Sequence, residues 1–83
     1  MKFVYLIRSL AAPGQRYVGV TSNLEERLRA HNAGESSHTS KYRPWELATF
    51  LCFADDQRAI DFERYLKSGS GHAFANKRLW PSS

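Results

Sequence analysis

Two short apolar runs open the chain, separated by a turn. Residues 2–8 carry apolar side chains on both faces, which is typical of a central strand covered on two sides. Residues 9–15 contain Ala-Ala-Pro-Gly, a turn sequence, and residues 16–21 form the second run. The short connection predicts an antiparallel hairpin. Gly19 stands where the second strand would otherwise carry a side chain, which indicates a bulge or the close approach of another group.

After the hairpin, the apolar residues recur with the period of a helix. Residues 22–25 (SNLE) match a capping box, so a helix is predicted over residues 23–32, with Gly34 ending it. On a 3.6-residue period Arg27 and His31 share one stripe with two leucines. The residues that carry chemistry on this helix are therefore expected on its apolar side.

The remaining elements follow from composition and period. Residues 35–44 are polar and predict a mobile surface loop, and residues 45–53 predict a third strand. A second helix is expected from residue 55 or 56 to 67, a break at Ser-Gly-Ser-Gly, and a last helix over residues 72–80. The order is β-β-α-β-α-α, an α/β protein of the α+β type. We expect one domain over residues 1–83, a small mixed or antiparallel three-stranded sheet flanked by helices.

Charge and composition narrow the choice of partners. The net charge is +4, and basic residues recur along the chain, which suits a polyanion such as nucleic acid, although many basic domains bind none. The apolar run at the N-terminus is too short for a membrane span or a secretory signal, so a cytoplasmic protein without a membrane partner is expected. The single Cys52 excludes an internal disulfide framework and is predicted to be buried.

Two charged residues fall on apolar stripes. Arg27 lies on the stripe of the first helix, and Glu63 interrupts the stripe of the second. A charge that faces a core costs several kcal/mol, in order of magnitude, unless it is paired or bound to a metal. Either the two residues form a buried ion pair, or each lies at the edge of its stripe, or they belong to a site. In the last case the carboxylate suits a divalent metal and the guanidinium a phosphate oxygen. Tyr5, Tyr17 and His31, taken alone, are better explained by core packing.

These residues resemble the GIY-YIG nuclease family, and in particular its small, free-standing, single-domain bacterial members. Residues 3–5 (FVY) are similar to the first signature triplet, and residues 17–19 (YVG) to the second. Residues 19–32 resemble the helix that carries the family's arginine, and residues 38–47 and 63–71 resemble later segments. The resemblance covers nearly the whole chain and implies the GIY-YIG fold.

The resemblance implies metal-dependent hydrolysis of a phosphodiester bond. Tyr5 would be the general base or would orient the attacking water, and His31 would help to accept its proton. Tyr17 would hydrogen-bond at the scissile phosphate, and Arg27 would hold a non-bridging oxygen. Glu63 would be the protein ligand of one Mg²⁺ or Mn²⁺ ion. A phenol with a pKa of about 10 is a poor base at neutral pH, so nearby cations are required.

The chain departs from the family pattern at two positions. Phe3 stands where the first triplet has glycine, and the triplet lacks its isoleucine. His72 stands where an arginine is usual in the small members. Expected contacts to nucleic acid come from the loop and the C-terminal helix: Lys41, Arg43, Asn76, Lys77 and Arg78.

Three functions compete at this point. The first is an endonuclease acting on DNA, with RNA as an alternative substrate, a setting in DNA repair or recombination, and a homodimer or partner protein to supply specificity. The second is a non-catalytic nucleic-acid-binding module with the same fold. The third is a structural domain in which an Arg27–Glu63 pair ties two helices together. The third leaves the two tyrosines without a role.

Overall fold

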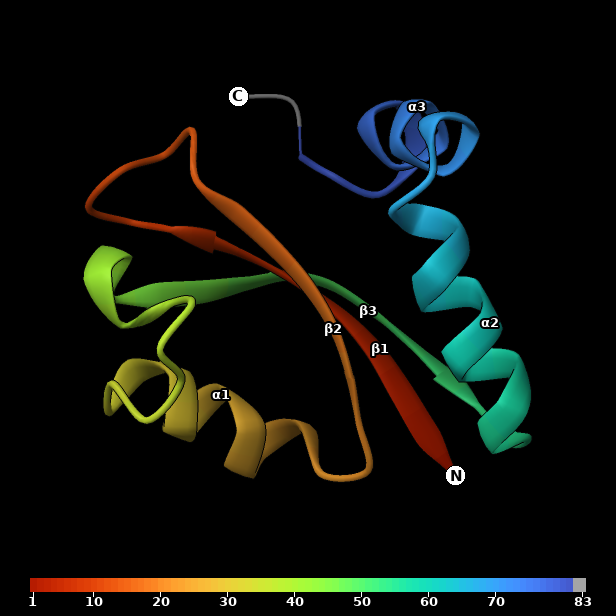
Figure 1. Ribbon diagram of the computed structural model, residues 1–83, viewed down its shortest axis with the longest axis horizontal. Helices are drawn as coiled ribbons and strands as arrows, with labels where there is room; N and C mark the ends of the chain where they lie inside the picture. Colours follow the sequence, from red (N-terminus) through yellow and green to blue (C-terminus); the bar gives the residue numbers. More distant parts are fainter. Residues whose placement is uncertain (82–83) are drawn as a thin grey trace.

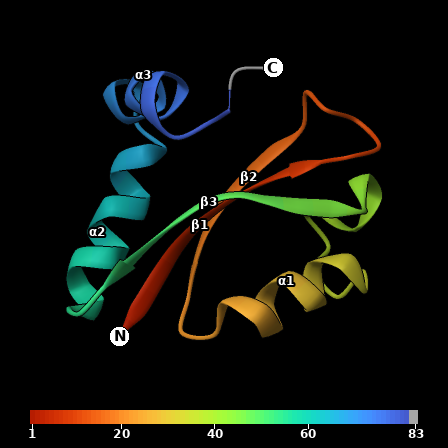
Figure 2. The same ribbon diagram turned by 180° about the vertical axis from the view of Figure 1, so that it is seen from behind.

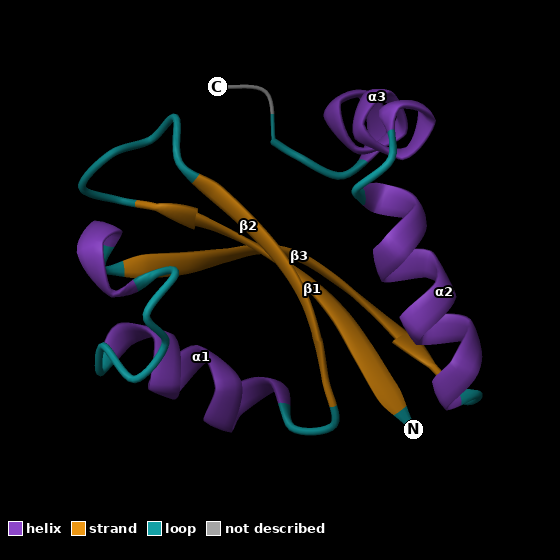
Figure 3. Cartoon of the chain, viewed as in Figure 1, coloured by secondary structure: helices purple, strands orange, loops and turns teal. Residues whose placement is uncertain are grey.

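The computed structural model describes residues 1–81, so residues 82–83 of the expected domain lie outside the described part. The three strands and three α-helices follow one another in the predicted order, and Figure 1 and Figure 3 show how they are arranged. A short 3₁₀ turn, η1, is added between the first helix and the third strand. The elements are β1 (Lys2–Ser9), β2 (Arg16–Thr21), α1 (Leu24–Asn32), η1 (Ser40–Tyr42), β3 (Trp45–Phe53), α2 (Asp56–Leu66) and α3 (Gly69–Arg78).

The sheet has the strand order β2-β1-β3, and both pairings are antiparallel. Of the two sheet types expected, the antiparallel one is therefore observed. β1 is the central strand, which explains why its side chains are buried on both faces. Tyr5 lies opposite Gly19 on β2, and a bulge between Leu6 and Ile7 shifts the register against β3.

The helices cover the two faces of the sheet separately. Figure 1 and Figure 2 show α1 and α2 on opposite sides of the strands. Val4 and Leu6 of β1 pack with α2, α3 and Trp80 in one core, while Tyr5 and Ile7 pack with α1 and β3 in the other. Alternate residues of one strand thus serve two cores, and Tyr5 belongs to the side of α1.

The helix ends differ from prediction by a few residues. Asn23, rather than Ser22, caps α1 and accepts a hydrogen bond from the Glu26 N–H at 3.1 Å. Gly34 follows α1 at a φ of 80°, as its role as a helix stop predicts. Ser68 accepts from the N–H of Gly71 at 3.2 Å and so caps α3. The predicted break is therefore shorter than expected, and α3 covers Gly69–Arg78 rather than residues 72–80.

The loop predicted to be mobile has a buried centre. Thr39 is 1% exposed, and its carbonyl accepts from the indole N–H of Trp45 at 2.8 Å. The Asn32 side chain exchanges two hydrogen bonds with the Trp45 backbone, at 2.6 and 3.1 Å. These contacts tie the loop to the end of α1 and the start of β3.

Cys52 is exposed, against expectation. It lies on the edge strand β3 opposite Phe3, near Phe50, which is itself half exposed. The nine-residue helix α1 packs near Tyr5 and Ile7 and leaves this end of the face uncovered. None of the helices within residues 1–81 has the length and apolar character needed to cross a membrane.

Candidate active site

The first feature of the candidate site is the Tyr5 side chain, which lies over Gly19 of the edge strand β2. Its cross-strand partner is Gly19, and a Cβ atom built on Gly19 would lie 2.4 Å from the Tyr5 hydroxyl oxygen. Real Cβ atoms do not approach other atoms so closely, so the phenol has this position only because residue 19 has no side chain. The close approach predicted at Gly19 is confirmed, and the approaching group is Tyr5.

Three aromatic rings gather at this point. The Tyr5 hydroxyl and His31 Nε2 are 2.8 Å apart, and the ring centroid of Tyr17 lies 5.2 Å from that of His31 and 6.3 Å from that of Tyr5. Neighbouring strands supply the two tyrosines, and the last turn of α1 supplies His31. A hairpin and the helix after it therefore bring together three of the predicted site residues.

Behind His31 lies a residue that the sequence did not single out. Thr39 Oγ1 is 2.6 Å from His31 Nδ1, so both ring nitrogens have a partner. Tyr5, His31 and Thr39 are at most 3% exposed. Two neutral tautomers of His31 satisfy these contacts: the imidazole proton is on Nδ1 in one and on Nε2 in the other. With the proton on Nδ1, the ring donates to Thr39 and leaves Nε2 free to accept from the phenol.

Burial keeps both titratable groups neutral. It raises the pKa of Tyr5 well above its ordinary value, and nearby Tyr17 and the negative charge of Glu63 add to this, while Arg27 opposes it. Burial lowers the pKa of His31, and the positive charge of Arg27 lowers it further. The charges of Arg27 and Glu63 therefore both act on the Tyr5 phenol, from helices on opposite sides of the sheet.

Arg27 and Glu63 do not pair with each other. Arg27 is exposed, which fits a position at the edge of its stripe. The Glu63 side chain is only 16% exposed, and its Oε2 lies 2.5 Å from Nζ of Lys67, the residue that follows the last residue of α2. Among the ion pairs of residues 1–81, none joins the two helices through Arg27 and Glu63. The buried-pair interpretation is wrong, and with it the purely structural function built on that pair.

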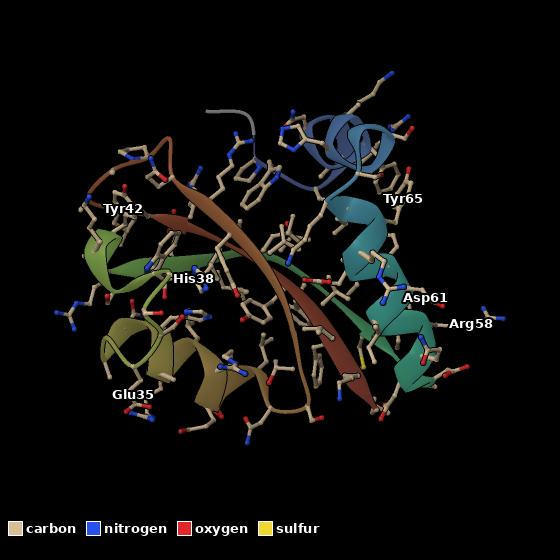
Figure 4. The ribbon with its side chains drawn as sticks, in the orientation of Figure 1. Glu35, His38, Tyr42, Arg58, Asp61 and Tyr65 are labelled. Carbon is tan, nitrogen blue, oxygen red and sulfur yellow. The ribbon has the colours of Figure 1, made fainter. Side chains whose placement is uncertain are left out.

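Figure 4 shows how α2 presents its two sides. The labelled side chains of Arg58, Asp61 and Tyr65 lie on the side of α2 away from the sheet. Glu63 is two residues from Asp61, roughly 200° around the helix, and so faces the sheet. Its low exposure follows from this position.

The donor set limits which metal the site could take. Residues 1–81 contain no group of three or more histidine, cysteine, aspartate or glutamate side chains placed to hold an ion. Glu63 is a single carboxylate, already paired with the cationic Lys67. Mg²⁺ keeps most of its waters and is commonly held by one or two carboxylates together with substrate phosphates. Glu63 fits such an ion and would not fit zinc, which takes several protein ligands.

The residues predicted to contact nucleic acid lie in two separate groups. Lys41 and Arg43 are exposed at η1, and Lys77 and Arg78 are exposed at the end of α3. Figure 1 and Figure 2 show η1 and α3 at opposite ends of the long axis. Asn76, also on α3, accepts a hydrogen bond from Arg16 Nη1 at 2.8 Å, so its side chain is engaged within the protein.

Sequence reasoning missed Thr39 and Lys67. Thr39 lies in a polar segment without a period, and its contact with His31 depends on how the loop packs on Trp45. Lys67 could have been found, because a glutamate followed four residues later by a lysine is a common helical ion pair.

The conserved-domain model described as the GIY-YIG catalytic domain matches residues 1–78. The chain belongs to the GIY-YIG family. The resemblance seen in the two triplets, Arg27 and Glu63 is thereby confirmed. The β-β-α-β-α-α order predicted from the sequence agrees with the observed arrangement.

Relatives of two kinds are similar to this chain. The structure-specific endonuclease subunit SLX1 of Debaryomyces hansenii is 38% identical over 71 residues, covering 77% of this chain and 20% of that protein. A UPF0213 protein of Haloquadratum walsbyi is 34% identical over 67 residues, covering 80% of this chain and 73% of that protein. A UPF0213 protein of Bacillus pumilus is also 34% identical over 67 residues, covering 80% of this chain and 66% of that protein. The chain thus spans about one fifth of the SLX1 protein and most of the Haloquadratum protein.

Proposed function

We propose that this GIY-YIG protein is an endonuclease that hydrolyses phosphodiester bonds in DNA with the help of Mg²⁺ or Mn²⁺. Membership of a catalytic-domain family and the endonuclease name of the SLX1 relatives support the reaction class. The observation that carries the proposal is the Tyr5–His31 hydrogen bond over Gly19, beside Tyr17. A phenol held against a neutral imidazole has a route for its proton that core packing does not require.

Tyr5 and His31 act together as the base. A phenol with a raised pKa does not lose its proton to bulk water at neutral pH. Instead, the attacking water gives its proton to the Tyr5 oxygen as the phenol proton passes to His31 Nε2. In the tautomer that this step uses, Thr39 accepts from Nδ1–H and Nε2 is unprotonated. After this step His31 is an imidazolium and Tyr5 is a neutral phenol.

Arg27 and Tyr17 act on the phosphate. The exposed guanidinium of Arg27 donates to a non-bridging oxygen, where negative charge grows in the transition state. The Tyr17 hydroxyl donates to the same phosphate. Glu63 would hold the divalent ion, which would supply positive charge next to the phosphate. Lys67, which is paired with Glu63, is a cation close enough to this carboxylate to contact the DNA backbone beside it.

Binding of the substrate uses the basic residues outside this cluster. Lys41 and Arg43 at one end, and Lys77 and Arg78 at the other, contact phosphates, and Asn76 adds a polar contact. RNA is the alternative substrate. The word subunit in the SLX1 relatives' name supports a partner protein or a second copy as the source of specificity, and their structure-specific activity favours a role in DNA repair or recombination.

Cleavage of plasmid and branched DNA tests this function. The wild-type protein should cut in Mg²⁺ or Mn²⁺ and stop in EDTA. Arg27→Ala should lower the cleavage rate by about 100- to 1000-fold, the usual cost of losing one transition-state donor. Arg29→Ala is the matched control on the same helix, because Arg29 pairs with Glu26 and Glu35. Salt-sensitive binding without cleavage of any DNA or RNA would instead establish the binding module.

A further inference from the structure

A hollow adjoins the candidate site on the other side of β2. It has a volume of about 340 Å³ and lies between β2, the end of α2 and α3. Its apolar lining comes from Val18, Leu66, Ala75 and Trp80. Leu66, Ala75 and Trp80 belong to the buried core, so this surface is held firmly in place.

The rest of the lining is basic or aromatic. Arg16, Lys67 and His72 line the hollow together with Tyr17, and none of its lining residues is acidic. The Arg16 guanidinium carbon lies 4.8 Å from the centre of the Trp80 ring, and Arg16 also donates to Asn76. An apolar floor with cations around it is complementary to a ligand that has a flat apolar part and negative charge.

Two residues belong to the hollow and to the candidate site. Tyr17 lies against His31 in the ring cluster, and Lys67 is paired with Glu63. A ligand in the hollow would therefore lie next to the phosphate on which Tyr17 and Glu63 act. This continuity links the hollow to the reaction.

We propose that the hollow binds one unpaired nucleotide adjoining the scissile phosphate, with its base on the apolar floor and its phosphate among the cations. The volume is within the range of small-molecule pockets, about 300–1,000 Å³. A base inside a duplex is stacked and paired, so it reaches such a hollow only where the strand is single or locally open. The substrate is thus DNA with an unpaired nucleotide beside the cleavage point, an inference that rests on the proposed function.

Binding without metal tests the hollow separately from catalysis. A duplex with a single-stranded flap and a fully paired duplex of the same length are compared by fluorescence anisotropy in EDTA. The wild-type protein should bind the flap about tenfold more tightly, a typical effect of one base stacking on a protein surface. Equal affinity for the two DNAs would overturn the proposal.

Two variants assign that preference to the hollow. Val18→Phe fills the hollow, and Val20→Phe is its control, because Val20 packs on the same core from the same strand but does not line the hollow. Val18→Phe should reduce the preference to within about twofold, and Val20→Phe should keep it. His72→Ala, at an exposed position near the start of α3, should also reduce the preference for the flap. If Val18→Phe fails to fold, the result with His72→Ala alone tests the hollow. A preference unchanged in folded Val18→Phe or in His72→Ala would contradict the proposal.

The result can be separated from the fate of the nuclease. If the wild-type protein prefers the flap but never cleaves in Mg²⁺, the endonuclease is refuted and the nucleotide site is retained. If it cleaves flap and duplex equally and binds them equally, the endonuclease is retained and the nucleotide site is refuted.

Discussion

At the scale of single residues, the position of the Tyr5 phenol depends on two neighbours, one without a side chain and one that can accept a hydrogen bond. Gly19 offers no side chain beneath the phenol, and His31 offers a ring nitrogen beside it. Each of these two conditions can be changed by one substitution while the strands and helices stay as they are.

Gly19→Ala should displace the phenol. Its Cβ would overlap the Tyr5 hydroxyl, so the ring must move by an ångström or more. Cleavage should fall by about 100-fold, the usual cost of such a misplacement, and stability by about 1–3 kcal/mol. Gly14→Ala is the control, because nothing lies within 4 Å of a Cβ at that turn position. Cleavage rates and thermal unfolding of both variants are compared with the wild type, and an active Gly19→Ala protein would contradict the role given to Tyr5.

His31 should set the acid limb of the pH profile. Its pKa is below the ordinary value of about 6.5, so the ring is neutral at pH 7 and can accept the phenol proton. As the pH falls through that lowered pKa, the ring is protonated and cleavage should be lost. The folded state also binds fewer protons there than the unfolded state, so the stability held above pH ~6.5 declines in the same direction.

The measurement is cleavage rate and urea unfolding between pH 8 and pH 4. His31→Gln, which does not titrate, should lose most of its activity and the acid-side decline in stability. A wild-type protein whose activity stays constant as the pH falls to 4 would show that His31 accepts no proton.

The sequence could place most of these residues but not the contacts between them. Tyr5, Tyr17 and His31 followed from the resemblance, and Gly19 from its place in a strand. Thr39 could not be predicted, because it acts across a loop whose shape is decided by Asn32 and Trp45.

At the scale of elements, the helix α2 places the proposed metal ligand, Glu63, one turn before the cationic Lys67. The Lys67 ammonium lies against the carboxylate of Glu63, where a divalent ion would have to bind. Cation binding at Glu63 must therefore displace this ion pair.

Lys67→Met should make the divalent ion easier to bind. Removing a partly exposed ion-pair partner is worth about 1 kcal/mol at most, so the Mg²⁺ concentration for half-maximal cleavage should fall by up to about fivefold. Arg58→Met is the control, since Arg58 lies on the side of α2 away from the sheet (Figure 4). A Mg²⁺ requirement that rises in Lys67→Met, or that falls as much in Arg58→Met, would contradict the competition between Lys67 and the ion at Glu63.

The hydrophobic patterns predicted the three strands and the first two helices, because the apolar residues of each element follow the spacing of a strand or of a helix. They failed at α3, where Ser68 accepts a hydrogen bond that turns the expected break into a helix start. Two glycines in that segment weigh against a helix on propensity, and a cap with its tertiary packing overrides them.

At the scale of the whole molecule, the two-faced sheet carries the site at its β2 edge. α1 reaches this edge from one face and α2 from the other, which is why the charges of Arg27 and Glu63 act on one phenol. The sequence left the sheet type open between mixed and antiparallel. The pairing of β1 with β3 joins residues more than 30 positions apart, so no local pattern could decide it.

The most direct test of the account is metal-dependent cleavage by the wild type and by Glu63→Gln. Both are incubated with flap DNA in Mg²⁺ and in EDTA, and binding is measured alongside. The wild type should cleave only with the metal, and Glu63→Gln should lose at least about 100-fold of that activity while binding DNA within a few-fold of the wild type. Equal cleavage by the two proteins, or cleavage by the wild type in EDTA, would contradict the proposed nuclease site.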